Sequence, residues 1–170
     1  SPGSIFYIQK RIGRNYREFQ CIKFRTMYEN ADDLLPNLLE KYPLMRKEFE
    51  KDFKLRRDPR ITKLGRFLRR SSLDELPQFF NVLKGEMSVV GPRPIVSNEI
   101  NKYSLFMEEV VSVRPGLTGL WQVSGRNNLS YKKRVQLDLV YARNRNFVLD
   151  LEIIILTLGV LLFPMDRGAF

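Results

Sequence analysis

The longest apolar segment, residues 147–164 with the sequence "FVLDLEIIILTLGVLLFP", sets the first limit on what this chain can form. Its uninterrupted apolar part, from Ile153 to Phe163, is only about half of the roughly 20 residues that a helix needs to cross a bilayer. Asp150 and Glu152 stand at its edge. The segment therefore predicts a buried helix or a helix lying in a membrane interface, and not a spanning one.

Periodicity predicts the elements in the first third of the chain. Residues 5–27 carry β-branched and aromatic side chains on both sides of "GRNYR", which predicts a hairpin of two short strands. Residues 34–53 carry apolar side chains at steps of three and four, which predicts helix. Because proline disrupts a helix interior, we expect two helical pieces that face the core, interrupted at Pro36 and Pro43.

The rest of the chain alternates helices with rigid turns. Residues 64–84 have helical patterns on both sides of an Asp-Glu pair, and glycines and prolines over residues 85–94 then break the chain. A glycine-rich loop covers residues 114–126, and helical patterns return after it. These patterns predict an α+β fold, helix-rich with a small β-hairpin or sheet, in one domain over residues 1–170.

Charge and composition narrow the function. The chain has 29 Lys and Arg against 19 Asp and Glu, a net charge of +10, so its natural partners are anionic: nucleic acid, an acidic lipid surface or phosphorylated small molecules. The sequence contains no histidine, which excludes a Ser-His-Asp triad and a histidine-based zinc site. Its single cysteine, Cys21, indicates a reducing compartment and a buried, inert thiol.

Two adjacent carboxylates, Asp74 and Glu75, stand just after the basic run "RFLRR", which ends at Arg70. Ser72 and Glu75 fit the capping-box pattern, in which side chains at a helix start satisfy free N–H groups. If Asp74 is the cap instead, Pro77 falls harmlessly in the first turn. Both alternatives place the pair at a helix start, where backbone N–H groups favour anions. The cations just before it are Arg66, Arg69 and Arg70.

These residues supply the parts for phosphoryl transfer without histidine. A carboxylate can attack phosphorus, guanidinium groups can hold phosphate oxygens, and a second carboxylate can hold Mg²⁺. "GPRP", residues 91–94, fixes Arg93 between two prolines, which is either a plain rigid turn or a pre-organised anion or base contact. The loop "PGLTGLWQVSGR" adds Thr118, Gln122 and Arg126 as candidate substrate-binding residues, although its spacing fits neither a P-loop nor a Rossmann fingerprint.

Three motifs together, "KFRTM" (23–27), "DPRITKLGRFLRRSSLDELPQFFNVLKGEMSVVGPRP" (58–94) and "RPGLTGLWQVSGR" (114–126), resemble the bacterial sugar transferase family. These are the monotopic polyprenyl-phosphate phosphoglycosyl transferases. The resemblance covers essentially the whole chain. It is greatest to the catalytic C-terminal domain of the large subgroup, typified by undecaprenyl-phosphate galactose phosphotransferases.

The resemblance implies a two-step reaction on a UDP-sugar. Asp74 would attack the β-phosphorus, expel UMP and carry a covalent phosphosugar, which undecaprenyl phosphate would then take. Asp74 and Glu75 would form a carboxylate dyad. Glu75 would be its Mg²⁺-linked partner, and Asp74 would be the other metal-binding carboxylate. Arg93 would contact the uridine. The residues serving phosphate groups would be Lys23, Arg25 and Arg69.

The resemblance also implies a place in the cell. Family members act at the cytoplasmic face of the bacterial inner membrane, with a re-entrant membrane helix, and in the large subgroup further transmembrane helices, before the strand that begins here. We expect those segments to lie outside these 170 residues. Ser4 stands where the family often has proline, which we interpret as a tolerated change. The helices at 34–53 and 153–163 would rest on an anionic membrane surface.

Several alternatives stay open at this stage. The transferred group could be galactose-1-phosphate, glucose-1-phosphate, or the phosphate of an N-acetylated or diamino sugar, and a homo-oligomer remains open. A basic nucleic-acid-binding module is a rival class, suggested by aromatic residues among cations in "KRIGRNYREF". We do not expect nucleic acid as a partner. A non-catalytic membrane scaffold is the third reading, and the intact Asp-Glu pair argues against it.

Overall fold

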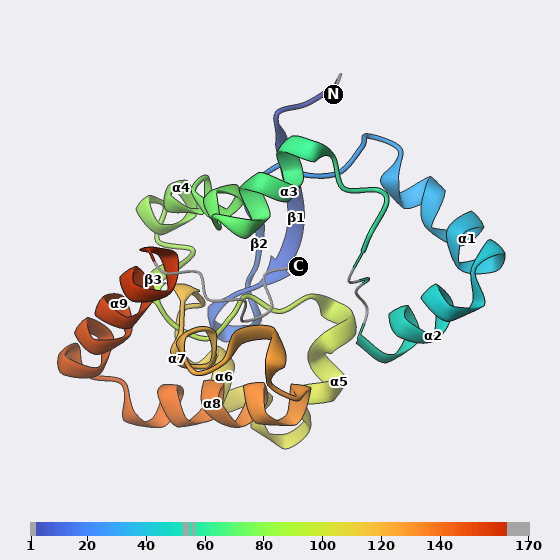
Figure 1. Ribbon diagram of the computed structural model, residues 1–170. Helices are drawn as coiled ribbons and strands as arrows, with labels where there is room; N and C mark the ends of the chain where they lie inside the picture. Colours follow the sequence, from blue (N-terminus) through green and yellow to red (C-terminus); the bar gives the residue numbers. More distant parts are fainter. Residues whose placement is uncertain (1–2, 53–54, 56, 163–170) are drawn as a thin grey trace.

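The computed structural model describes residues 3–52, 55 and 57–162. Phe53 and Phe163, which belong to two of the predicted helical patterns, lie outside these residues. The architecture is mixed α+β, as predicted, with two small sheets and many short helices (Figure 1).

The predicted hairpin is confirmed. Strands β1 (Phe6–Ile12) and β2 (Glu18–Phe24) pair antiparallel through their full length, from Phe6 opposite Phe24 to Ile12 opposite Glu18. The turn between them contains Asn15 and Tyr16 with positive φ angles of 54° and 61°. A bond of 2.8 Å from the Gly13 N–H to the Arg17 carbonyl closes it.

A second sheet was not predicted. Strands β3 (Ser88–Val90) and β4 (Gly116–Thr118) form a short parallel pair. Each has three residues, too few to produce an alternating pattern. Gly116 is needed there because a Cβ atom would lie 2.1 Å from the Gly91 backbone nitrogen. The glycines of this region, which the sequence suggested were only chain breakers, therefore allow two backbones to pack closely.

Helices account for most of the remaining chain. The helical patterns predicted around the Asp-Glu pair and after residue 130 are confirmed, with α3 capped by Thr62 and α8 by Ser130. Among the helices that the structure describes, none is both long and apolar enough to cross a membrane. The helices of the main body are α3 (Lys63–Arg70), α4 (Gln78–Leu83), α5 (Ile100–Tyr103), α6 (Met107–Val111), α7 (Leu120–Val123), α8 (Tyr131–Asn144) and α9 (Phe147–Leu162).

The core lies where the end of the hairpin meets the C-terminal helices. Its largest cluster joins Ile12 and Ile95 to side chains of α5, α6 and α8. A second cluster packs Val90 of β3 against Tyr141 of α8 and Ile153 of α9. A third places Cys21 with Phe19 and Met87, so the expected burial of the thiol is confirmed.

Helices α1 (Ala31–Lys41) and α2 (Pro43–Asp52) do not face the core, which corrects the prediction. They pack on each other and stand to one side of the body (Figure 1). In α1 only Ala31 is buried, and Leu44 of α2 is 82% exposed. The prediction of two pieces is right, but Pro36 lies inside α1 without ending it and the break falls before Pro43 alone.

Candidate active site

The two carboxylates lie in a single 3-10 turn, Leu73–Glu75, between α3 and α4. The predicted capping box does not form, because the Ser72 side chain makes no cap hydrogen bond and its backbone is left-handed, with a φ of 57°. Helix α4 begins only at Gln78, after Pro77. The pair therefore precedes the helix by a turn and projects from a strained corner, which is common at functional sites.

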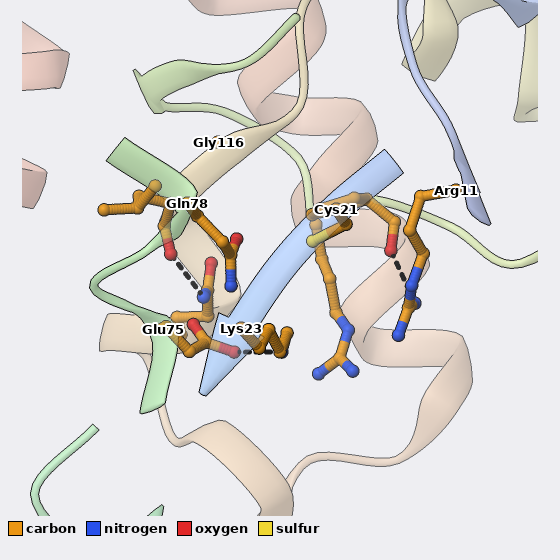
Figure 2. Close-up of a pocket in the computed structure, with 10 residues that line it drawn as sticks. Arg11, Cys21, Lys23, Glu75, Gln78 and Gly116 are labelled. Atoms are coloured by element: carbon orange, nitrogen blue, oxygen red, sulfur yellow. Dashed lines mark hydrogen bonds and ion pairs between the residues drawn. The ribbon is translucent and has the colours of Figure 1, made fainter. Parts of the chain in front are cut away.

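Glu75 pairs with a lysine instead of capping a helix. Its Oε1 accepts a hydrogen bond from the Lys23 Nζ at 2.6 Å, and Figure 2 shows this contact beside Cys21. The Lys23 side chain is 19% exposed and that of Glu75 32% exposed. A charge-assisted hydrogen bond at such a half-buried position stabilises the fold more than a neutral cap bond does. Glu75 therefore bonds to Lys23, and the prediction of a capping box was wrong.

Asn81 joins the turn of the dyad to the hairpin. It is fully buried on α4, accepts a bond from the Ile22 N–H at 3.1 Å, and donates to the Gln20 carbonyl at 2.8 Å. These two bonds tie α4 to the backbone of β2 on both sides of Cys21. The position of Glu75 relative to Lys23 of β2 is thereby fixed.

The surroundings move the pKa values of the two carboxylates in opposite directions. Burial raises the pKa of Asp74 above its ordinary value and the charge of Glu75 adds to this, while Lys23 and Arg69 only partly oppose it. Burial alone would raise the pKa of Glu75 too, but Lys23 and two arginines outweigh burial and lower it. Glu75 is therefore the fixed negative charge, and Asp74 is the more basic carboxylate of the dyad.

Arg69 is held beside Asp74 by the segment that follows β2. Its Nε donates to the Thr26 Oγ1 at 2.9 Å, and burial, more than any neighbouring charge, lowers its pKa. Helix α3 can come this close because Gly65 faces Thr26, where a Cβ atom would lie 1.9 Å from the Thr26 carbonyl oxygen. The Thr62 N–H also donates to that carbonyl, at 3.0 Å.

Arg93 and Arg11 form a second group of cations. The Arg93 guanidinium lies 6.0 Å from the centre of the Trp121 ring. Arg11, buried on β1, donates to the Pro94 carbonyl at 2.9 Å and so holds the Arg93 turn against the hairpin (Figure 2). Burial lowers the pKa of Arg11, and the nearby charge of Arg93 lowers it further.

A buried acid supports the Arg93 turn from below. Asp138 of α8 is 1% exposed and its Oδ2 accepts a hydrogen bond from the Tyr103 hydroxyl at 2.9 Å. Burial raises the pKa of Asp138 to about 7, although the bond from Tyr103 and the backbone N–H of Arg93 both favour the ionised form. This carboxyl therefore changes charge near neutral pH.

A cavity of about 510 Å³ brings the predicted site residues together. That size suits a nucleotide-sugar. Within it, Arg126 donates from Nη2 to the Ser72 Oγ at 3.0 Å, and Arg25 donates from Nε to the Ser4 carbonyl at 2.6 Å. The predicted residues that line it are Lys23, Arg25, Arg69, Asp74, Glu75, Arg93, Gln122 and Arg126.

Thr118 is the one predicted residue that the structure does not bring to this cavity. It is buried in β4, and its hydroxyl lies 2.7 Å from the Thr157 hydroxyl of α9. The contact joins the second sheet to the C-terminal helix. Its neighbour Gln122 does line the cavity and donates from Nε2 to the Leu117 carbonyl at 3.1 Å.

The dyad supplies the carboxylate ligands that this site could offer to a metal ion. Among the described residues, no three acidic or cysteine side chains are grouped as a set of metal ligands. Two carboxylates are nevertheless enough for Mg²⁺, which keeps several waters and takes its other ligands from substrate phosphates. Asp74 and Glu75 therefore fit a Mg²⁺ ion that arrives with a diphosphate.

Sequence reasoning missed Arg11, Asn81 and Asp138. The alternation of β1 gave a signal for Arg11, because Gln9 and Arg11 share the face of the hairpin that carries Cys21 and Lys23. Asn81 and Asp138 gave none, because a single polar residue in a helical pattern normally faces solvent. Only the packing of each helix shows that they are buried.

A carboxylate dyad among guanidinium and ammonium groups, in a cavity of this size, is a site suited to phosphorylated ligands. The chain belongs to the bacterial sugar transferase family, whose sequence model matches residues 1–164. It is 51% identical over 160 residues to the undecaprenyl-phosphate galactose phosphotransferase of Salmonella typhimurium, covering 94% of this chain and 34% of that protein.

Two further relatives extend the comparison. The UDP-galactose-lipid carrier transferase of Erwinia amylovora is 47% identical over 160 residues, covering 94% of this chain and 34% of the relative. The UDP-glucose:undecaprenyl-phosphate glucose-1-phosphate transferase of Xanthomonas campestris pv. campestris is 41% identical over 165 residues, with coverages of 92% and 31%. The chain thus spans about a third of the length of these curated relatives.

Proposed function

We propose that this chain transfers a sugar-1-phosphate from a UDP-sugar to undecaprenyl phosphate, as a membrane step in bacterial surface polysaccharide synthesis. The observation that carries the proposal is the dyad itself: a basic Asp74 beside an ionised Glu75, in a cavity lined by cations. The names of the relatives support the same reaction class. Galactose-1-phosphate or glucose-1-phosphate is the group proposed, with an N-acetylated sugar phosphate as the alternative.

The first step is a displacement at the β-phosphorus. A carboxylate oxygen of Asp74 forms a bond to phosphorus while the bond to the bridging oxygen breaks, and UMP leaves with that oxygen. Lys23, Arg25 and Arg69 hold phosphate oxygens and stabilise the developing charge, and Arg93 contacts the uridine. The product is a phosphosugar bound covalently to Asp74.

The second step returns the enzyme to its starting state. A phosphate oxygen of undecaprenyl phosphate attacks the same phosphorus, and the bond to Asp74 breaks, so the carboxylate is regenerated. The sugar leaves as a lipid-linked diphosphate. Because both steps occur at one phosphorus, a single fixed carboxylate and one set of cations serve both.

Mg²⁺ is proposed as the cofactor, held by Asp74 and Glu75 together with the diphosphate. When bound, it neutralises charge on the phosphate oxygens. The Lys23 Nζ lies 2.6 Å from the Glu75 Oε1 and favours the ionised form of Glu75. Asn81 fixes α4 against β2 and so fixes the position of Glu75 relative to Lys23.

The lipid substrate places this chemistry at a membrane, and we propose the cytoplasmic face of the inner membrane. An exposed apolar stripe on α9 supports this placement, since its residues recur at steps of three and four along one side of the helix. The net charge of +10 would favour an anionic leaflet. The stripe consists of Val148, Leu151, Ile155, Leu158 and Leu162.

The test is release of UMP from a UDP-sugar by the purified protein in detergent, with undecaprenyl phosphate and Mg²⁺ present. We expect turnover with UDP-galactose or UDP-glucose and a complete loss with Asp74→Asn. The matched control is Asp33→Asn, an exposed aspartate on α1. Turnover that survives Asp74→Asn would overturn the role of Asp74, and no UMP from any UDP-sugar would overturn the proposed activity.

A further inference from the structure

The cavity around the dyad has two ends with different charge. Near one end, Arg93 and Arg11 lower the pKa of Glu75, and Trp121 closes the wall. Near the centre, Asp74 and Arg69 lie within electrostatic reach of each other. This half of the cavity is lined by cations and suits the phosphates and the nucleotide of a donor.

The opposite end is built by the chain that leaves β2 and enters α1, together with the segment that precedes α3. Beyond Arg69 the cavity wall continues through Asp58 and Arg60 to Tyr28 and Asp32. Asp58 and Arg60 neutralise each other in a buried two-bond ion pair, with contacts of 2.9 and 2.7 Å. What this end presents to a ligand is therefore hydroxyl and carboxylate oxygen rather than positive charge.

The backbone of this wall is fixed. The Tyr28 N–H donates to the Arg60 carbonyl at 3.0 Å, and the Arg60 Nη1 donates to the Ala31 carbonyl at 3.3 Å. The phenol of Tyr28 and the carboxylate of Asp32 make no hydrogen bond or ion pair with any other residue that the structure describes. Both groups are therefore available to a ligand from a rigid support.

We propose that Tyr28 and Asp32 are specificity-determining residues that bind the hydroxyl groups of the transferred sugar. The inference rests on the proposed function, which sets the β-phosphorus beside Asp74. With the uridine bound near Arg93, the sugar must lie in the remaining part of the cavity, beside Tyr28 and Asp32. A carboxylate and a phenol are good partners for a neutral, polyhydroxylated ring, whereas Asp32 would repel a phosphate.

The same wall gives a function to the α1–α2 pair, which contributes little to the core. The segment that leaves β2 becomes α1 on the side of the molecule away from α9 (Figure 1). Its first turn carries Asp32 into the cavity lining, while the rest of the pair stays outside the core. The sugar end of the site is thus formed in part by the first turn of a helix that packs outside the core.

The experiment compares donor selectivity in Asp32→Ala and Tyr28→Phe with that of the wild type. The matched control is Asp33→Ala, because Asp33 lies in the same first turn of α1 and does not line the cavity. The rate of UMP release is measured with UDP-galactose, UDP-glucose and their N-acetylated counterparts, and UDP serves as a competitive inhibitor that lacks the sugar.

We expect the ratio of kcat/KM between the preferred donor and its epimer to change about tenfold or more, because lost hydroxyl contacts act on one donor more than on another. Inhibition by UDP should stay unchanged, and the Asp33→Ala variant should match the wild type. An equal fall for all donors, or weaker inhibition by UDP, would overturn the inference. If the wild type released no UMP from any donor, the proposed function itself would fail.

Discussion

The ion pair between Lys23 and Glu75 is the residue-scale feature on which the dyad depends. Replacing Lys23 with Met removes the charge and keeps the length of the side chain. We expect the unfolding free energy to fall by about 1–2 kcal/mol, less than for a fully buried pair because both groups keep some contact with water. We also expect UMP release to fall at least about 100-fold, since Glu75 is left half-buried without its partner.

Lys10→Met is the control for this variant. Lys10 belongs to the same hairpin and pairs with Glu18, but both of those side chains are largely exposed. Such a pair contributes at most about 1 kcal/mol and does not touch the cavity. Chemical denaturation and the UMP assay measure both effects. Equal losses in the two variants would contradict a special role for the Lys23–Glu75 pair.

At this scale the sequence predicted most of the residues that line the cavity, but not the hydrogen bonds that they make. The Asp-Glu pair was noticed from its local chemistry, and the roles of Lys23, Arg25, Arg69 and Arg93 came from the resemblance to the sugar transferase family. The motifs did not predict that Ser72 would accept a bond from Arg126, or that Thr118 would bond to Thr157. These contacts join residues that are distant in the chain, and local patterns carry no information about them.

Between elements, the contact of α3 with the segment after β2 depends on Gly65. We expect Gly65→Ala to cost about 1–3 kcal/mol in unfolding free energy, because its Cβ would overlap the Thr26 carbonyl and push the helix away. UMP release should fall as well, since Arg69 would move with α3 away from Asp74.

Gly159→Ala provides the matched substitution. Gly159 lies in α9 with no atom within 4 Å of the added Cβ, so alanine should leave activity unchanged and stabilise the helix by up to about 1 kcal/mol. Thermal unfolding and the UMP assay measure both variants. A Gly65→Ala protein as stable and active as the wild type would show that this packing is not required.

The contact of α8 with α5 makes stability depend on pH through Asp138. Burial raises the pKa of Asp138 to about 7, so the folded protein binds this proton more tightly than the unfolded chain does. Its contribution is therefore complete at acid pH and is lost as the pH rises through 7. Relative to Asp138→Asn, we expect the wild type to lose on the order of 4 kcal/mol of unfolding free energy between about pH 4 and pH 8.

Denaturant titrations of both proteins across this pH range measure the difference. Asparagine is nearly isosteric and cannot lose a proton, so the common effect of other acids cancels. A constant difference between the two proteins would mean that Asp138 titrates at its ordinary value, and the account of its burial would be wrong.

Element prediction succeeded where a pattern was long enough to have a period. The hairpin was predicted from β-branched and aromatic residues on both sides of a turn, α8 from a helical pattern, and α9 from a long apolar run. The parallel pair of β3 and β4 was missed because three residues have no period, and its glycines serve close packing. The pair α1 and α2 was recognised as helical, but its apolar face did not predict burial in the core.

For the whole molecule, the exposed stripe of α9 is the proposed contact with the membrane in which the lipid substrate would lie. We expect Ile155→Glu to weaken binding to anionic lipid vesicles about tenfold or more, because a charge would replace apolar contact with the membrane. Ile155 is 59% exposed, so stability should not change.

Leu105→Glu is the control, since Leu105 is 89% exposed and lies outside the stripe. Vesicle flotation at low and high salt measures binding of both variants. If the two substitutions weakened binding equally, the stripe would not be the membrane contact.

The proposed two-step reaction passes through a covalent phosphosugar on Asp74, which the intact mass of the protein would reveal. The purified protein is mixed with Mg²⁺ and UDP-galactose or UDP-glucose without lipid, and the product is fragmented to locate any modification. We predict an added hexose phosphate on Asp74, absent from Asp74→Asn and removed when undecaprenyl phosphate is supplied. Lipid-dependent UMP release with no adduct, or an adduct on another residue, would contradict the covalent role of Asp74.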